Sequence, residues 1–275
     1  MDYSKKRIVI TGASSGIGLE LAIQLSHFAS VAIVAVARNI EGLERLALPG
    51  VTALAYDLAK EQNVHDMLAE AIGILGAIDV FFANAGFTYY EQLTKPDYLH
   101  IEEIYRTNVF SPILALQWLL YLNGKRQCMF VVTSSAIVDV PMPGFSLYGS
   151  TKSAITTFAD AIRHELPPHM GMCVVYPVAT ATDFFRRAGK DVPIPFPLQE
   201  TQLVAHRILK GVARQKKRIY PSALHVLFKL LWRIFPFIKT LYINGEKKKY
   251  KKWLAAQIKK KPRSLPEESI WYNKR

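Results

Sequence analysis

A tyrosine and a lysine four residues apart, Tyr148 and Lys152 in "YGSTK", are residue types that could carry out proton transfer. On a helix, positions i and i+4 lie on one face, so the phenol and the ammonium group can point into the same space. A free tyrosine has a pKa near ~10, and a neighbouring ammonium group stabilises its phenolate form. The same spacing also occurs on solvated helices, so the rest of the chain must decide whether this pair is chemical.

The elements that would position this pair form a regular alternation of strands and helices. Near-continuously apolar runs, as expected of strands buried on both faces of a parallel sheet, occupy residues 7–11, 31–37, 51–57, 78–86, 128–135 and 172–177. Segments with helical periodicity lie at 16–28, 61–75, 98–122 and 147–166. Repeated βαβ units of this kind predict an α/β fold with a doubly wound parallel sheet.

The first predicted strand ends in "TGASSGIG", residues 11–18, directly before a predicted helix. Glycines at 12, 16 and 18 permit a tight turn and a close approach of a diphosphate to the backbone, while the helix N-terminus offers free N–H groups. Because this turn opens a βαβ series, it favours a nucleotide site over a merely structural turn.

The chain resembles the short-chain dehydrogenase/reductase family in the order of its motifs. After the Gly-x-x-x-Gly-x-Gly turn come "ANAG" at 83–86, Asn108 in "RTNVFSP", "TSS" at 133–135, "YGSTK" and "YPVAT" at 176–180. The resemblance covers about residues 5–220. It implies a single Rossmann-like domain, residues 1–220, and leaves residues 221–275 as a basic, amphipathic C-terminal extension.

The resemblance implies four catalytic residues: Asn108, Ser135, Tyr148 and Lys152. Tyr148 would protonate a carbonyl oxygen as hydride arrives from a nicotinamide, and Ser135 would hydrogen-bond that oxygen, with Ser134 as a weaker candidate. Lys152 would stabilise the phenolate and bind the nicotinamide ribose. Asn108 would hold a water that links the lysine to solvent.

The end of the second predicted strand bears on the choice of cofactor. NAD-preferring members of the family place a carboxylate there, whereas this chain has Ala37 followed by Arg38. A guanidinium suits a 2′-phosphate, so NADP(H) is favoured over NAD(H), with Asn39 as a helper. Alternatively, Arg38 stacks on the adenine or faces water. The other implied cofactor contacts are Gly12, Ser14, Ser15, Gly16, Ile17, Gly18, Asp57, Asn84, Ala85, Gly86, Pro177 and Thr182, together with Tyr148 and Lys152.

Two residues depart from the family pattern, and one segment points to the substrate. Val138 and Val178 stand where many members carry glycine, and Val178 leaves the shape of the nicotinamide pocket open. Residues 182–198 fall where the family carries its substrate lid, and Phe184 and Phe185 there predict an apolar cover for a bulky, hydrophobic carbonyl or alcohol. Exposed Phe side chains could equally pack on a neighbouring subunit of a dimer or tetramer.

The bulk composition excludes several other classes of protein. Only two cysteines are present, and both lie in apolar runs. A disulfide framework is therefore not expected, and a reducing, cytoplasmic compartment is the simpler interpretation. No Cys/His cluster has metal-ligand spacing, so no metal is expected. The N-terminus runs into a predicted strand within a few residues, which predicts no signal peptide.

The net charge of +13 lies in the C-terminal extension. Residues 216–275 hold 17 Lys/Arg against three Asp/Glu, whereas residues 1–215 hold 18 against 19. A helix over 222–235 is predicted, with a kink at Pro236 and with His225, Lys229 and Arg233 as a polar stripe on an otherwise apolar surface. This pattern suggests peripheral binding to an anionic membrane. The alternatives are that the helix caps the substrate pocket or meets a partner subunit; nucleic-acid binding is unlikely, because no base-reading motif accompanies the charge.

These observations together predict an NADPH-dependent reductase of a hydrophobic, lipid-like ketone or aldehyde, placed in the cytoplasm and peripherally at a membrane. An NAD-dependent alcohol dehydrogenase acting on steroids or lipids is the alternative within the enzyme class. A different class is a non-catalytic, cofactor-binding adaptor recruited to membrane or nucleic acid by its basic tail.

Overall fold

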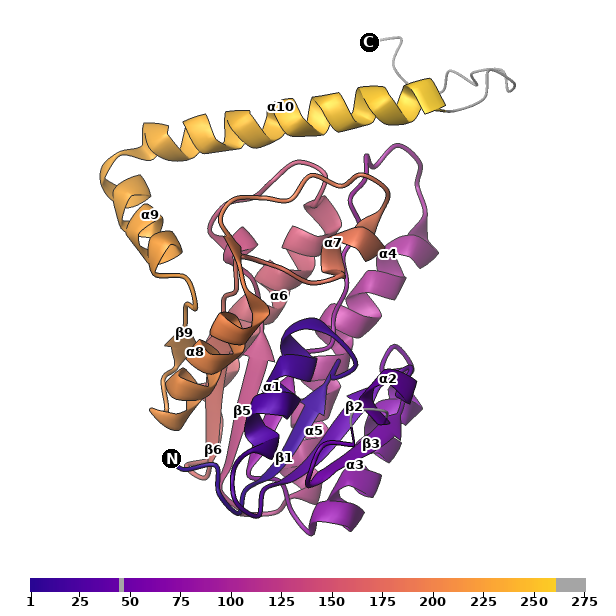
Figure 1. Ribbon diagram of the computed structural model, residues 1–275, viewed down its shortest axis with the longest axis vertical. Coiled ribbons are helices and arrows are strands. Elements are labelled where there is room, and N and C mark those ends of the chain that lie inside the picture. Colours follow the sequence, from indigo (N-terminus) through magenta and orange to yellow (C-terminus); the bar gives the residue numbers. More distant parts are fainter. Residues whose placement is uncertain (45–46, 261–275) are drawn as a thin grey trace.

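The computed structural model describes residues 1–44 and 47–260, so residues 261–275 of the extension lie outside the described part. Its centre is a seven-stranded parallel sheet with the strand order β3-β2-β1-β4-β5-β6-β9 (Figure 1). The strands are β1 (Arg7–Thr11), β2 (Ala32–Ala37), β3 (Val51–Ala55), β4 (Val80–Ala83), β5 (Cys128–Thr133), β6 (Met170–Val175) and β9 (Arg218–Ile219). The predicted parallel α/β sheet is confirmed, and β9 adds an edge strand that was not predicted.

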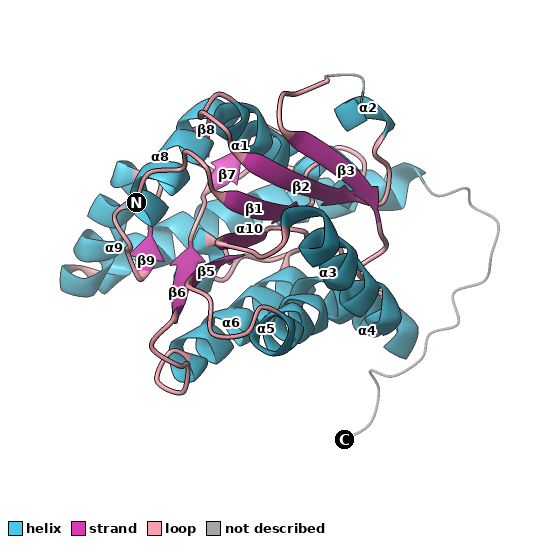
Figure 2. Cartoon of the chain, turned by 90° about the horizontal axis from the view of Figure 1, so that it is seen from below, coloured by secondary structure: helices cyan, strands magenta, loops and turns pink. Residues whose placement is uncertain are grey.

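Helices cover both faces of the sheet (Figure 2). One face packs against α1 (Gly16–Ser26) and α8 (Thr201–Ala213), and the other against α3 (Glu61–Leu75), α5 (Ser111–Leu122) and α6 (Ser146–Ile162). The smaller elements are α2 (Glu41–Glu44), α4 (Tyr98–Tyr105), α7 (Phe184–Ala188), a 3-10 helix (Ala136–Val138) and a short two-stranded sheet of β7 (Ala179–Thr180) and β8 (Leu198–Gln199).

The two faces enclose two hydrophobic cores, which explains why the strands are continuously apolar. In β1, Ile8 and Ile10 point into the core under α1 and α8, whereas Val9 points into the core under α3, α5 and α6. All three side chains are fully buried. Each contributes about 1.5–3 kcal/mol of hydrophobic stabilisation, so neither face of the strand could carry a polar side chain without loss.

The strand order reverses between β1 and β4, and the carboxyl ends of these strands meet there. The Thr11 hydroxyl at the end of β1 donates to Phe82 O (3.2 Å) and accepts from the backbone N–H groups of Asn84 (3.0 Å) and Ala85 (3.1 Å). This edge is where open parallel α/β sheets bind ligands. Thr11 therefore fixes the "ANAG" segment beside the glycine turn.

The segment 98–122, predicted as one helix, contains a turn of π-helix at Arg106–Phe110 between α4 and α5. The Ser111 N–H donates to Arg106 O, five residues back. Pro112 has no N–H to donate to Asn108 O, so a regular α-helix would lose a hydrogen bond there in any case. π-turns are common at functional sites, and this one carries Asn108.

The C-terminal extension forms two helices, α9 (Ala223–Ile234) and α10 (Pro236–Lys260). Where a kink at Pro236 was predicted, the first helix ends at Ile234 and the second begins at Pro236. Figure 1 shows α10 crossing the end of the molecule at which the carboxyl ends of the strands lie, with α9 linking it to β9. Within residues 1–44 and 47–260, no helix has both the length and the apolar character needed to cross a bilayer.

Candidate active site

The turn between β1 and α1 requires glycine at positions 12, 16 and 18. Gly12 and Gly16 have φ values of +68° and +57°, which disfavour other residues. A Cβ at Gly18 would overlap the Gly12 carbonyl oxygen, and one at Gly16 would lie 3.0 Å from Thr182 Cγ2. Ser15 precedes α1 without capping it through its side chain, so the first N–H groups of the helix remain available for an anion.

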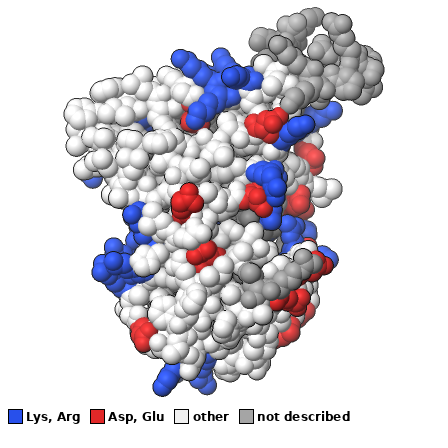
Figure 3. Space-filling view, in the orientation of Figure 1, with Lys and Arg blue, Asp and Glu red and all other residues white. Residues whose placement is uncertain are grey.

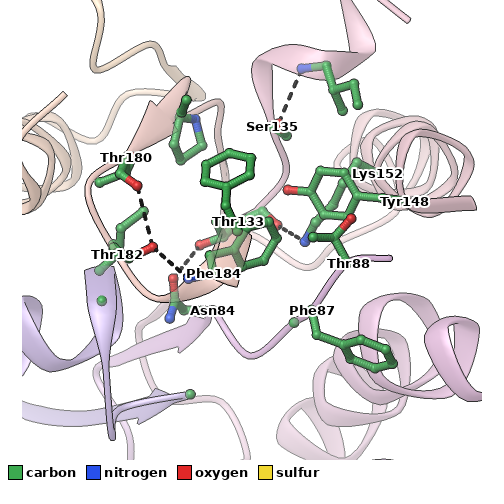
Figure 4. A pocket seen from close by; sticks show the side chains of 18 of the residues that line it. Asn84, Phe87, Thr88, Thr133, Ser135, Tyr148, Lys152, Thr180, Thr182 and Phe184 are labelled. Carbon is green, nitrogen blue, oxygen red and sulfur yellow. Dashed lines mark hydrogen bonds between the residues drawn. The ribbon is translucent and has the colours of Figure 1, made fainter. Parts of the chain in front are cut away.

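A cavity of about 760 Å³ begins at this turn and extends along the carboxyl ends of the strands to the C-terminal helices. The predicted cofactor residues that line it are Gly12, Ser14, Ser15, Gly16, Ile17, Arg38, Asn39, Asp57, Asn84, Ala85, Gly86, Pro177 and Thr182; Gly18 lies one turn behind, under Gly12. Figure 4 shows Ser135, Tyr148 and Lys152 on one side of this pocket and Thr180 and Thr182 on the other.

Tyr148 and Lys152 lie on α6 and face the cavity together. The Lys152 Nζ lies 5.7 Å from the centre of the Tyr148 ring and donates to Thr133 O at 2.8 Å. Burial raises the pKa of Tyr148 to about 12, although a hydrogen bond with Ser135 acts in the opposite direction. Burial lowers the pKa of Lys152 to about 8. The tyrosine is therefore a neutral proton donor at physiological pH, beside an amine that titrates only slightly above it.

Asn108 is held rigidly behind this pair. Its Nδ2 donates to Phe87 O (2.9 Å) and to Thr151 Oγ1 (3.1 Å), and its Oδ1 accepts from Phe87 N (3.1 Å). Gly86 lies between Asn108 and Lys152, since a Cβ there would be 3.0 Å from Asn108 Oδ1 and 3.4 Å from Lys152 Nζ.

The two candidate serines at the end of β5 differ in their surroundings. Ser134 is buried and its Oγ bonds to Lys152 O (3.1 Å) and Thr156 Oγ1 (2.6 Å), which ties β5 to α6. The Ser135 Oγ accepts from Ile137 N at 3.2 Å, and the influence of Ser135 on Tyr148 favours the phenolate. Of the two serines, Ser135 is therefore the one that interacts with Tyr148.

At the end of the cavity where the adenine is expected, three predicted residues lie just after β2 and β3. Arg38 is exposed on the rim. The Asn39 Oδ1 accepts from Glu41 N (3.0 Å) at the start of α2, and the Asp57 Oδ1 accepts from Ala59 N (3.2 Å). Tyr56 and Leu58 also line this end, and the sequence analysis did not name them.

The opposite end of the cavity is apolar and aromatic. Phe184 lies against Tyr148, with ring centroids 5.5 Å apart, and Phe185 packs against Phe145 at 6.1 Å. Both residues that were predicted to form the lid thus line the cavity. Val178 also faces it, where the family pattern has glycine.

The C-terminal helices complete this apolar end, which corresponds to the alternative in which the tail caps the pocket. His225, Phe228 and Trp232 of α9 and Tyr242 of α10 line the cavity. None of these four residues was predicted to belong to the site. Helical periodicity indicated two faces on α9, but it contains no information on which face meets the body.

The carboxylate of Asp139, just after the 3-10 helix, holds α9 in place. It accepts from His225 Nε2 at 3.0 Å and from Lys229 Nζ at 2.9 Å. Although burial acts in the opposite direction, these hydrogen bonds lower the pKa of Asp139. The Lys229 Nζ also donates to the Tyr220 hydroxyl at 2.8 Å.

The residues present fit a dinucleotide. The glycine turn gives the close backbone approach that a pyrophosphate needs, and the N-terminus of α1 supplies donors for it. Lys152 places a buried amine beside Tyr148, where a ribose hydroxyl could accept a hydrogen bond. No group of His, Cys, Asp and Glu among the described residues is arranged to hold a metal ion.

Comparisons with known proteins agree with this geometry. The family model for short chain dehydrogenases matches residues 6–193. The chain is 26% identical over 261 residues to an 11-beta-hydroxysteroid dehydrogenase of Pinus massoniana, covering 85% of this chain and 71% of that protein.

Two solved structures share the fold. A short-chain dehydrogenase/reductase from Burkholderia phymatum, in complex with NAD, has a TM-score of 0.74 and 17% identity, covering 87% of this chain and 96% of that one. A short-chain dehydrogenase from Sphingobium yanoikuyae, in complex with NADPH, has a TM-score of 0.70 and 21% identity, covering 96% and 99%. This chain therefore belongs to the short-chain dehydrogenase family and is an NAD(P)-dependent oxidoreductase acting on CH–OH or C=O groups.

Proposed function

We propose that this protein is an NADPH-dependent reductase that acts on the carbonyl of a hydrophobic, lipid-like ketone or aldehyde. The observation that carries the proposal is the cavity itself, in which an aromatic, apolar end leads to a protonated Tyr148. The name of the pine relative, a hydroxysteroid dehydrogenase, is consistent with a bulky apolar substrate.

In this proposal Tyr148 and Ser135 act on the substrate oxygen. When bound, the reduced nicotinamide supplies the hydride. The Ser135 hydroxyl donates a hydrogen bond to the carbonyl oxygen, and the Tyr148 hydroxyl transfers its proton to that oxygen as negative charge develops there. The ammonium group of Lys152 stabilises the resulting phenolate. Asn108 fixes the backbone of Phe87 behind Lys152. In this proposal it holds a water that links Lys152 to solvent, and the phenolate regains its proton through that water.

The protonation state of Tyr148 bears on which role this residue can take at neutral pH. Reduction needs a neutral phenol as acid, whereas oxidation of an alcohol needs a phenolate as base. With a pKa of about 12, Tyr148 is overwhelmingly neutral near pH ~7. The phenol is therefore ready to act as the acid of a reduction, whereas the net direction is set by the ratio of reduced to oxidised cofactor.

Turnover of Tyr148→Phe tests whether the chain is an enzyme of this kind. We expect the reduction of long-chain and steroid ketones with NADPH to fall at least ~10²-fold, because the proton donor is lost. NADPH binding, measured by fluorescence titration, should remain within about twofold, which separates lost chemistry from lost folding. Unchanged turnover would favour the cofactor-binding adaptor instead.

Arg38→Ala tests the choice of cofactor. A guanidinium on the rim of the adenine end suits a 2′-phosphate, so the variant should lose affinity for NADPH about tenfold or more and keep its affinity for NADH. Equal losses for both cofactors would show that Arg38 does not contact the phosphate. Lys60→Ala, which removes an exposed cation that does not line the cavity, is the control.

We further propose a cytoplasmic homo-oligomer that associates peripherally with membrane. Large apolar side chains of the segment 98–122, among them Leu99 of α4, Phe110 of the π-helical turn and Tyr121 of α5, are exposed and could meet a second copy. The basic extension supports an attraction to anionic lipid.

A further inference from the structure

Helix α9 carries apolar side chains on both its inward and its outward surface. His225 is only 4% exposed, and with Phe228 and Trp232 it lines the cavity. The side chains on the opposite surface, Leu227 and Leu230, face solvent, as does Ile234 one turn further on. A surface helix of a water-soluble protein normally presents polar side chains, not aliphatic ones, on its outer surface.

Asp139 enforces this orientation. Its carboxylate, in a side chain that is 16% exposed, bonds both His225 (3.0 Å) and Lys229 (2.9 Å), so rotating α9 about its axis would strip this mostly buried carboxylate of two hydrogen-bond partners. The exposure of the aliphatic face is therefore built into the contacts with the body.

The exposed apolar surface continues past Pro236. Phe235, Phe237 and Leu241 at the junction of α9 and α10 are all exposed. In Figure 3 the corresponding upper left part of the molecule shows few charged side chains, and a group of basic ones follows further along α10. We call Leu227, Leu230, Ile234, Phe235, Phe237 and Leu241 the apolar face.

The charge around the apolar face selects its partner. Residues 223–260 contain ten Lys/Arg and a single acid, Glu246, which is buried and paired with Lys249. Arg233, Lys248 and Lys251 are exposed. A second copy docked here through a two-fold axis would bring like charges together, whereas an anionic lipid surface complements both the aliphatic and the basic side chains.

We propose that the apolar face docks this protein on the surface of an anionic lipid bilayer. The inner side of α9 then lines the cavity while its outer side lies among lipid headgroups and acyl chains, so a lipid-borne substrate has a short route to Tyr148. Docking does not depend on the proposed function. Only the route of a lipid-borne substrate to Tyr148 rests on the proposed function.

Co-sedimentation of the full chain with vesicles tests docking without any turnover. Vesicles of phosphatidylcholine with about 30 mol% phosphatidylglycerol should bind the protein, and pure phosphatidylcholine should bind it at least about tenfold more weakly. Leu230→Glu should lower binding to the anionic vesicles at least about tenfold, because it places a charge in the centre of the apolar face. The matched control is Leu93→Glu: Leu93 is 53% exposed in a loop, against 56% for Leu230.

Circular dichroism and NADPH binding establish that each variant is folded, and Ile234→Ser gives a second, milder change of the same face. Unchanged binding of a folded Leu230→Glu variant overturns the proposal, as does equal loss in Leu93→Glu. A third result would also overturn the proposal: the wild-type protein does not sediment with vesicles, and light scattering shows that Leu230→Glu dissociates its oligomer. That result would assign the apolar face to contact with a second copy.

Discussion

At the residue scale, the buried Lys152 makes a specific prediction for the pH dependence of reduction. Burial lowers its pKa to about 8, so the ammonium form that assists Tyr148 is present below that pH and is lost as the pH rises through it. Tyr148, with a pKa of about 12, stays neutral throughout. We therefore expect kcat/KM for reduction to fall as the pH rises through about 8.

Two substitutions test whether the fall of kcat/KM at high pH comes from Lys152. Lys152→Arg keeps a positive charge up to a pKa above ~12, so the fall near pH 8 should disappear even if the rate is lower. Lys152→Met should reduce the rate roughly 10²-fold at every pH, without the fall. A fall that persists unchanged in Lys152→Arg would have to come from another group.

The spacing of motifs placed most predicted site residues around one cavity, but it missed Asp139. Gly12, Gly16, Tyr148 and Lys152 are recognisable because a tight turn and a shared helix face impose local spacing. Asp139 meets His225 86 residues further along the chain. A single carboxylate in "AIVDVP" has no local pattern that could announce such a partner.

At the element scale, Asp139 acts as a positioning residue for α9. In Asp139→Asn the amide can accept from only one of the two donors, His225 and Lys229, and presents an N–H₂ group to the other. Loosening α9 loosens the wall made by Phe228 and Trp232. We expect KM for a hydrophobic ketone to rise about five- to tenfold with kcat within twofold, and stability to fall by about 1–3 kcal/mol.

Asp160→Asn is the matched control for that variant. The Asp160 carboxylate also bonds two cations, Arg163 at 2.8 Å and Arg218 at 2.6 Å, but it lies on α6 away from α9. Its loss should lower stability without raising KM. A kcat that falls in parallel with the rise in KM for Asp139→Asn would indicate damage to the catalytic groups instead.

The helices show what periodicity can and cannot predict. Residues 61–75 were predicted as a helix with the observed bounds, because α3 has one apolar face and packs it on the sheet. Residues 98–122 were predicted as one helix. The turn of π-helix at Arg106–Phe110 differs from an α-helix only because the Ser111 N–H bonds to the carbonyl five residues back instead of four, which periodicity does not show. In α9 the polar stripe was identified, but the sequence of the helix does not show that Asp139 would hold two of its members, His225 and Lys229, against the body.

At the scale of the whole molecule, the described residues present two exposed apolar surfaces that differ in charge. The surface of α4 and α5 exposes Leu99, Phe110 and Tyr121 in a segment, 98–122, with two acids and one basic residue. The apolar face of α9 and α10 is surrounded by an excess of Lys and Arg. Near-neutral apolar surfaces suit contacts between copies, whereas cationic ones suit anionic lipid.

This difference predicts that assembly and membrane docking can be abolished separately. Phe110→Glu combined with Tyr121→Glu should convert a dimer into a monomer in light scattering and leave vesicle binding per chain within about threefold, because the cationic surface is untouched. Leu230→Glu should do the reverse, leaving the dimer intact and lowering vesicle binding at least about tenfold. If one variant abolished both properties, α9 and α5 would have to serve a single interface, and the two surfaces could not be assigned to different partners.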